Sequence, residues 1–218
     1  MLKLRNVEKN YRRGAEVVRA LRGINLDIGV GEFAAVIGPS GAGKTTLLHI
    51  LGCLDLPSAG EIHFDGLRVD QMRESELVNL RRKKIGFIFQ QFYLIPGLSV
   101  GDNIALPLLF GKVKVERQRI RELARMVGLE QRLDHVPAQL SGGEMQRTAI
   151  ARALVNEPEM ILADEPTGNL DSANSAKIFD ILQRLHQDGL TVVMITHNPE
   201  LAGRAGRVLQ LRDGMIEA

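Results

Sequence analysis

A glycine-rich loop between a predicted strand and a predicted helix is the feature that most constrains the fold of this chain. Residues 38–45 satisfy the phosphate-loop pattern G-x-x-x-x-G-K-[ST]. An apolar run at 32–37 precedes the loop, and a segment with a broad apolar face follows from Lys44. In this context backbone N–H groups wrap phosphates at the positive end of a helix. The loop therefore predicts an α/β fold that binds a nucleoside triphosphate.

The loop and the first helical residues after it are the expected phosphate contacts: Gly38, Pro39, Ser40, Gly41, Ala42, Gly43, Lys44, Thr45 and Thr46. Lys44 is expected to reach the β- and γ-phosphates, and the Thr45 hydroxyl to ligate Mg²⁺. The expected ligands of this site are therefore a nucleoside triphosphate and Mg²⁺.

Three later apolar runs, at 85–89, 160–163 and 191–195, predict further strands, each near a helical stretch. This alternation predicts a mostly parallel sheet covered by helices on both faces. Between Phe89 and Met160 the pattern is helical, with helices expected over 114–127 and 144–155, which predicts an inserted helical lobe. We expect one domain over 1–218, with a core of residues 1–89 and 159–218 and an inserted helical subdomain at 90–158.

Two acidic residues, Asp164 and Glu165, end the predicted strand that begins at Met160. Carboxylates beside an apolar strand are costly unless they meet a cation or transfer protons. We expect Asp164 to bind Mg²⁺ and Glu165 to polarise the attacking water as a general base. Alone, such a pair more often forms an acidic turn, but together with the phosphate loop it predicts a Walker B site.

Gln90 and His197 also follow directly on predicted strands, where ligands gather in open α/β sheets. The Gln90 amide can meet Mg²⁺ or the attacking water, and His197 can contact the γ-phosphate and the same water. For the remaining histidines we expect packing or capping roles: His49, His63, His135 and His186.

A segment before a later predicted helix carries glycines and small polar residues that a packed core does not need: Leu140-Ser141-Gly142-Gly143-Glu144-Met145-Gln146-Arg147. It predicts a second phosphate-binding surface. One chain with two such surfaces indicates that two chains share nucleotide. We therefore expect a homodimer with nucleotide between the subunits.

Charge and composition exclude several classes of protein. The formal net charge of +2 is too small to argue for a nucleic-acid partner. The single cysteine, Cys53, allows no intramolecular disulfide and is expected to be buried, which fits a reducing compartment. No run approaches the roughly 18 apolar residues that cross a bilayer, and the start of the chain alternates like a strand, so we expect a protein soluble by itself.

Taken in order, these motifs resemble the nucleotide-binding subunit of ABC transporters over essentially the whole chain. The set comprises the phosphate loop, Gln90, Leu140-Ser141-Gly142-Gly143, Asp164-Glu165, Asn169-Leu170-Asp171 and His197. The resemblance implies a RecA-like P-loop NTPase: a mixed, mainly parallel sheet flanked by helices, an N-terminal antiparallel β subdomain and an inserted helical subdomain. It also implies an ATPase whose ATP-driven dimer closure drives a membrane partner.

Further roles follow from this resemblance: Q-loop residue for Gln90, D-loop residue for Asp171, switch histidine for His197 and adenine stacking for Tyr11. A surface tyrosine would look identical at position 11. The signature residues of one subunit are expected to face the γ-phosphate bound by the other: Ser141, Gly142, Gly143 and Glu144.

A narrower resemblance points to the lipoprotein-releasing and macrolide-exporter branch, which includes FtsE-like cell-division proteins. It rests on segments 51–60, 86–92, 103–108 and 164–171. It implies a membrane subunit with few spans and a peripheral position on the cytoplasmic side of the inner membrane. The alternatives are a soluble ABC ATPase of DNA repair or translation and a module that binds ATP without turnover. Soluble ABC ATPases usually carry two ATPase units in one chain. The presence of Glu165 and His197 argues against a module that binds ATP without turnover.

An apolar stretch directly after Gln90, residues 92–98, is the expected docking surface for the membrane permease subunit. It consists of Phe92, Tyr93, Leu94, Ile95, Pro96, Gly97 and Leu98. A loop has little reason to be so apolar unless it is covered. Packing inside the helical lobe is the alternative, and both can hold if some side chains face inward.

Overall fold

The computed structural model describes residues 1–14 and 16–217. The chain divides into two compact units, Met1–Arg81 with Thr191–Ala218, and Arg82–Leu190. The division expected from the sequence, 1–89 with 159–218 and 90–158, remains a prediction. No helix in the described part of the chain is long and apolar enough to span a membrane.

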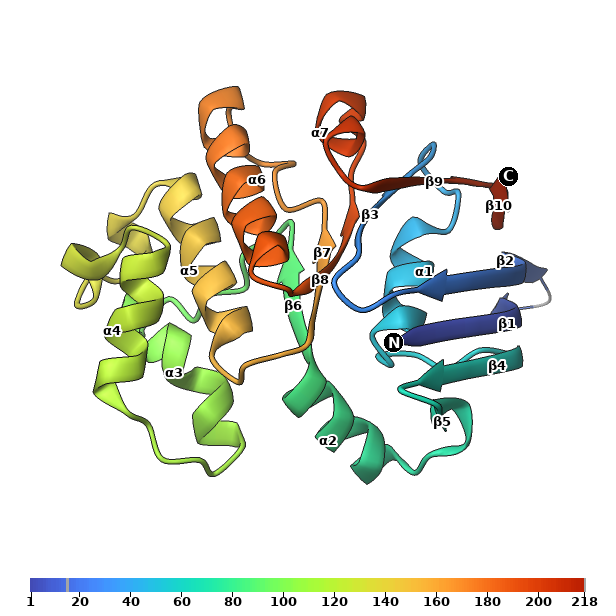
Figure 1. Ribbon diagram of the computed structural model, residues 1–218, viewed down its shortest axis with the longest axis horizontal. Helices are drawn as coiled ribbons and strands as arrows, with labels where there is room; N and C mark the ends of the chain where they lie inside the picture. The colour runs from blue at the N-terminus through green and yellow to red at the C-terminus, as the bar shows by residue number, and fades with distance from the viewer. Residues whose placement is uncertain (15, 218) are drawn as a thin grey trace. The chain divides into compact units, whose positions relative to one another are not determined.

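The first unit contains an antiparallel sheet in the order β2-β1-β4-β5 (Figure 1). Its strands are β1 (Leu2–Arg13), β2 (Glu16–Ile28), β4 (Ala59–Phe64) and β5 (Leu67–Arg68). Leu2, Leu4 and Val7 are buried, whereas Lys3 and Arg5 are exposed. This alternation is typical of an antiparallel sheet with one face on the core, and it confirms the expected N-terminal antiparallel subdomain.

The same unit also contains a second group of hydrogen-bonded strands, which is mainly parallel. These strands are β3 (Phe33–Ile37), β8 (Thr191–Ile195), β9 (Arg207–Arg212) and β10 (Met215–Glu217). Strand β3 pairs in parallel with both β8 and β9, and β10 pairs antiparallel with β9. All five residues of β8 are buried, as expected of a parallel strand covered on both faces.

The helices of the first unit are α1 (Lys44–Leu51), α7 (Pro199–Gly203) and most of α2 (Glu74–Lys84), which continues into the second unit. A 3-10 turn covers Val69–Gln71. Helix α1 begins at the expected Lys44 and buries Leu47, Leu48, Ile50 and Leu51. Cys53, just after it, is buried as expected, and burial raises its pKa to about 11.

The second unit combines two parallel strands with a group of helices. Its elements are β6 (Ile85–Phe89), β7 (Met160–Asp164), α3 (Val100–Phe110), α4 (Arg117–Met126), α5 (Gly142–Leu154) and α6 (Ser172–Gln187). Short 3-10 turns cover Glu130–Arg132 and Pro137–Gln139. Helices α3, α4 and α5 pack against one another (Figure 1). No strand is described between β6 and β7, which confirms the helical pattern expected there.

Candidate nucleotide-binding site

The phosphate loop, residues 38–45, connects the end of β3 to the first turn of α1. Gly43 has φ 102°, and a Cβ on it would lie 2.4 Å from the carbonyl oxygen of Ala20. Gly38 is equally constrained, because its Cβ would meet the carbonyl oxygen of Leu211 at 2.0 Å. The Lys44 ammonium donates to the carbonyls of Gly38 and Pro39 at 2.9 and 3.0 Å. The loop therefore folds tightly around its own lysine.

The N-terminus of α1 lacks the usual compensation of a helix end. Gly43 is the N-cap and supplies no side-chain hydrogen bond, and the first turn contains no acidic residue. The first N–H groups of a helix have no partner within the helix, and its dipole is positive there. Residues 44–46 thus present N–H groups and a lysine to an approaching anion.

His197 lies at the same strand edge as the phosphate loop, within the first unit. The parallel register pairs Val36 of β3 with Ile195 of β8, and the Thr196 N–H donates to the Val36 carbonyl at 3.1 Å. One strand therefore continues into Gly38 and its neighbour into His197. The His197 side chain is exposed, so the expected position beside the loop agrees with a role toward a phosphate.

Tyr11, on β1, is tied to the segment around α1. Its hydroxyl donates to Asp55 Oδ2 at 3.0 Å and is also hydrogen-bonded to Thr46. The Lys9 ammonium reaches Asp55 Oδ1 at 2.6 Å and lies 5.1 Å from the centre of the Tyr11 ring. Burial raises the Tyr11 pKa, and the Asp55 carboxylate adds to the effect. The ring is half-buried beside the first turn of α1, and its stacking on adenine remains a prediction.

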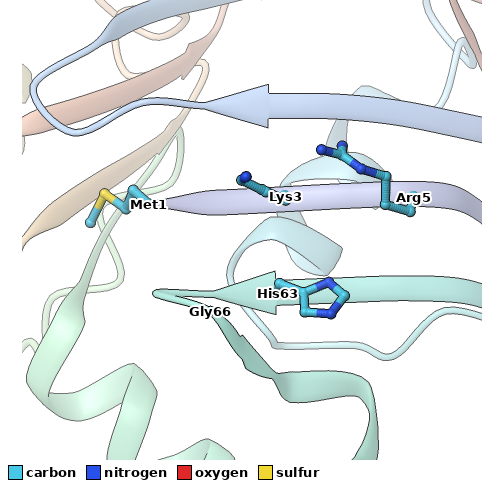
Figure 2. Close-up of a pocket in the computed structure, with 5 residues that line it drawn as sticks. All are labelled: Met1, Lys3, Arg5, His63 and Gly66. Carbon is cyan, nitrogen blue, oxygen red and sulfur yellow. The ribbon is translucent and has the colours of Figure 1, made fainter.

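A cavity of about 430 Å³ opens on the exposed face of the antiparallel sheet. It is lined by Met1, Lys3, Arg5, His63 and Gly66, and Figure 2 shows the side chains of Lys3 and Arg5 on β1 and of His63 on β4. The Arg5 guanidinium is paired with Asp27 at 2.5 and 2.9 Å. None of the residues expected to bind nucleotide lines this cavity.

The ends of β6 and β7 place Gln90 and Glu165 next to each other in the second unit. Phe89 pairs with Asp164 in parallel register, so Gln90 and Glu165 are the next residues of the two strands. Gln90 Nε2 donates to Asn169 Oδ1 at 3.2 Å, and Asn169 Nδ2 donates to the Gln90 carbonyl at 3.0 Å. The amide side chains of Gln90 and Asn169 thus fasten the segment after β6 to the segment after β7.

Glu165 has a strained backbone. Its φ is 46°, in the left-handed region that costs a non-glycine residue about 1–2 kcal/mol. A hydrogen bond of 3.0 Å from the Gly168 N–H to its carbonyl closes the turn. Strain of this kind gathers at functional positions, where the surrounding structure imposes it. Among the described residues, seven other non-glycine residues share this left-handed φ, so the role of Glu165 as general base remains a prediction.

The signature segment, Leu140–Arg147, ends in the first two turns of α5, and the helix begins at Gly142 rather than the expected Glu144. Ser141 Oγ accepts from the Glu144 N–H at 3.3 Å, and Glu144 Oε2 accepts from the Ser141 N–H at 2.9 Å. This is a capping box, which fixes the start of the helix. The hydrogen bonds from the Ser141 N–H and hydroxyl hold the Glu144 pKa below its ordinary value.

Asn174 joins the signature segment to the start of α6. Asp171 caps α6 by accepting from the Asn174 N–H at 2.8 Å, which lowers the Asp171 pKa, and Asn174 Nδ2 donates back to Asp171 at 2.7 Å. A Cβ on Gly143 would lie 2.6 Å from Asn174 Oδ1. Gly143 is therefore the residue that lets α5 approach the cap of α6.

A buried amide, Gln146, holds the same region from the α5 side. It is 0% exposed, and its Nε2 donates to the carbonyls of Phe89 at 3.3 Å and Pro166 at 2.8 Å. These carbonyls are adjacent in sequence to Gln90 and Glu165. Sequence reasoning missed Gln146, because a polar residue in a predicted helix gives no sign that it is buried.

The stretch at 92–98 is partly exposed and is held by α5. Tyr93 and Ile95 are 61% and 45% exposed, whereas Phe92, Leu94 and Leu98 are half-buried. The guanidinium of Arg152, on α5, donates to the backbone carbonyls of Phe92 and Tyr93. Burial lowers the Arg152 pKa. Some side chains of this stretch thus face inward, as the packing alternative expects, and the docking role of the exposed ones remains a prediction.

An α/β fold in which a glycine-rich loop joins a buried parallel strand to an uncapped helix defines a P-loop NTPase, the class that binds nucleoside triphosphates. A family model described as ABC transporter matches residues 21–168. The chain belongs to the ABC transporter family and is an ATP-binding cassette with ATPase activity. The family and the fold expected from the sequence are confirmed.

Relatives extend over nearly the whole chain. MJ0796, an uncharacterized ABC transporter ATP-binding protein of Methanocaldococcus jannaschii, is 49% identical over 224 residues, covering 100% of this chain and 95% of that protein. The macrolide export ATP-binding/permease protein MacB of Chlorobium luteolum is 49% identical over 217 residues. That match covers 99% of this chain but 33% of MacB, so the chain spans a third of that relative. The expected macrolide-exporter relationship is confirmed.

Solved structures of the M. jannaschii cassette have the same fold. One is a dimeric post-hydrolysis state of MJ0796 bound to ADP and Pi, with a TM-score of 0.92 and 46% identity over 100% of this chain and 97% of that chain. A second dimeric structure of MJ0796 gives the same TM-score of 0.92 at 47% identity. At this identity the solved structures indicate the same family as well as the same fold.

Proposed function

We propose that this chain hydrolyses ATP to energise a membrane permease, with two copies closing around ATP. The observation that carries the proposal is the first turn of α1, which has no capping side chain, no acidic residue and a lysine bent over the loop. The dimeric MJ0796 structure with ADP and Pi supports the paired arrangement. The MacB name, which joins ATP-binding and permease functions, supports a macrolide-type export system.

Each group of residues has one role in the proposed reaction. Residues 38–46 bind the phosphates of ATP, and Tyr11 stacks on its adenine. Glu165 polarises the attacking water, while His197 and Gln90 orient that water and the γ-phosphate. Ser141, Gly142 and Gly143 of the second copy meet the γ-phosphate, and Asp171 positions them through Asn174. The inserted helical subdomain is proposed to span 90–158.

Magnesium fits the donors that the chain offers. Among the described residues, no group of three or more His, Cys, Asp or Glu side chains could by itself hold a metal ion. Mg²⁺ needs no such group, because it binds through one or two carboxylates, waters and the phosphates of its substrate. Thr45, Asp164 and Gln90 offer oxygen donors of that kind. Bound there, Mg²⁺ would neutralise charge developing on the phosphates.

The permease is proposed to dock on the stretch at 92–98. Tyr93 and Ile95 offer apolar surface, and Arg152 fixes the backbone beneath them. In this proposal the chain is a peripheral subunit at the cytoplasmic side of the membrane. Replacing Tyr93 and Leu94 with Asp should abolish stimulation of ATP hydrolysis by the permease and spare basal hydrolysis. Equal loss of both activities would show that these side chains only pack within the unit.

The decisive experiment for the proposed function is Glu165→Gln. The variant should bind ATP as the parent does but lose hydrolysis by at least about 100-fold, because general-base catalysis contributes 10²–10⁴-fold. It should also accumulate an ATP-dependent dimer, measured by size-exclusion chromatography with light scattering. Glu159→Gln, at an exposed ion pair with Lys84, is the matched control and should keep both properties of the parent. Unchanged turnover in Glu165→Gln would remove the proposed role.

A further inference from the structure

Three apolar side chains are exposed at the end of α3 and in the connection to α4, whose course Figure 1 shows. Phe110 is 80% exposed, Leu109 56% and Val113 50%. Single exposed apolar residues are ordinary on a protein surface, but adjacent ones on a projecting turn indicate a contact with another apolar phase. We call residues 109–117 the apolar-basic turn.

Basic side chains flank this apolar tip. Residues 109–121 contain five basic residues and one acidic residue, although the formal net charge of the whole chain is only +2. Lys112, Lys114 and Arg117 are exposed. Within residues 1–14 and 16–217 their side chains form no hydrogen bond or ion pair, whereas Arg119 pairs with Glu157 at 3.3 Å. Positive charge is thus concentrated beside Phe110 and directed to solvent.

The turn is ordered by its backbone, so it presents these side chains in a fixed arrangement. The N–H of Gly111 donates to the Pro107 carbonyl at 3.0 Å, and that of Val113 to the Leu108 carbonyl at 2.9 Å. Arg82 Nη1 donates to the Gly111 carbonyl at 3.2 Å. Lys112 has φ 54°, a conformation in which glycine is usual at a helix end. The chain keeps a lysine where glycine would relieve strain.

We propose that the apolar-basic turn binds the surface of a bilayer that contains anionic lipids. Phe110, Leu109 and Val113 enter the boundary between headgroups and acyl chains, and Lys112, Lys114 and Arg117 contact lipid phosphates. Peripheral proteins bind membranes through this combination of apolar insertion and attraction to anionic headgroups. An acidic protein partner would complement the basic side chains, but it would not account for the exposed side chain of Phe110.

This surface is separate from the proposed permease docking stretch. Ile95 of the docking stretch is hydrogen-bonded to Asn103 near the start of α3, whereas the apolar-basic turn begins at Leu109 in the last turn of that helix, so about 9 Å of helix separates them. Lipid binding also needs neither nucleotide nor permease. The proposal therefore goes beyond ATP hydrolysis, and the two can fail independently.

The test is co-sedimentation of the whole chain, without nucleotide, with vesicles of phosphatidylglycerol and phosphatidylcholine or of phosphatidylcholine alone. The parent should bind the anionic vesicles at least about tenfold more tightly, because each basic residue near an anionic surface contributes about fivefold. Phe110→Ser should weaken that binding by about tenfold, a factor within the range for burying one aromatic side chain. Lys112→Gln with Lys114→Gln should weaken it by about 25-fold.

Matched controls use exposed residues outside the turn. Val30→Ser removes an apolar side chain that is 79% exposed, and Lys83→Gln removes an exposed lysine. Both should bind vesicles as the parent does, and basal ATP hydrolysis should be unchanged in all variants, which shows that they fold. Equal binding of both vesicle types by the parent would overturn the proposal. So would equal losses in Phe110→Ser and Val30→Ser.

Discussion

Two helices in this molecule begin next to glycines, yet the positive charge at their N-termini is compensated differently. Helix α1 begins after Gly43 with no capping side chain and no acidic residue, and its first residue is Lys44. Helix α5 begins after Ser141, which forms a capping box with Glu144. The first end is left positive, and the second is satisfied by its own hydroxyl and carboxylate.

The difference teaches that glycine content alone does not make a phosphate site. Both segments are predicted as phosphate-binding surfaces from sequence, but only α1 has the electrostatics to hold an anion by itself. At α5 the Ser141 N–H and the Glu144 N–H already have partners within the box. The signature segment should therefore bind phosphate weakly unless a nucleotide held elsewhere is brought against it.

The largest effect should follow from removing the cation at α1. Lys44→Ala should reduce ATP affinity by about 100-fold, because a hydrogen bond to a charged group contributes about 1.5–3 kcal/mol. Fluorescence titration of the monomer with a labelled ATP analogue measures this loss. Ser141→Ala is the comparison at α5 and should leave monomer affinity within about twofold. If both variants lose affinity equally, the two helix ends are equivalent and the contrast fails.

A smaller effect should follow from filling the space at Gly143. Gly143→Ala should lower the free energy of unfolding by about 1–3 kcal/mol, because the new Cβ meets Asn174 Oδ1. Monomer affinity for ATP should not change, since α1 holds the nucleotide. Thermal unfolding measures the loss, and Gly143→Ala with Asn174→Ala should recover part of it relative to Asn174→Ala alone. No recovery would mean that Asn174 is not the obstacle.

The smallest effect should follow from Glu144→Gln. Gln keeps the capping box but removes a negative charge from the positive end of α5, where a charge is worth about 0.3–1 kcal/mol. We expect an ATP-dependent dimer about two- to fivefold tighter, measured by analytical ultracentrifugation. A weaker dimer would indicate that the Glu144 carboxylate itself contacts the partner.

The parent and Glu144→Gln should also differ in how their thermal stability depends on pH. Because the Glu144 pKa is lowered in the folded state, its contribution to stability is full above the ordinary glutamate pKa and is lost as pH falls through the lowered value. The parent should therefore lose thermal stability over that acidic range relative to Glu144→Gln. Parallel pH profiles of the two proteins would contradict the assignment.

Much of the fold follows from local sequence patterns. The alternation of Leu2, Leu4 and Val7 predicts the first strand, and the pattern at 32–37 predicts the strand before the phosphate loop. The predicted start of α5 is two residues late. The spacing of Ser141 and Glu144 is itself a capping-box signal, and it identifies the correct start at Gly142.

The parts that sequence did not predict depend on contacts between distant segments. Nothing local to Asn174 shows that it lies against Gly143, and nothing local to Arg152 shows that its guanidinium reaches the carbonyls of Phe92 and Tyr93. The strained φ of Glu165 likewise arises from the turn that follows β7. Periodicity reports which face of an element is apolar, but it does not report which partner meets that face.

The contacts of Gln146 affect when two residues of the proposed reaction move. Its single amide nitrogen holds the carbonyls of Phe89 and Pro166, each one residue away from a residue of the proposed reaction, Gln90 and Glu165. A rotation of α5 would displace both carbonyls together. Gln90 and Glu165 would then move into or out of their reactive positions at the same time. The amide would thus synchronise the two side chains, and a half-assembled reaction centre would be a rare state of the cycle.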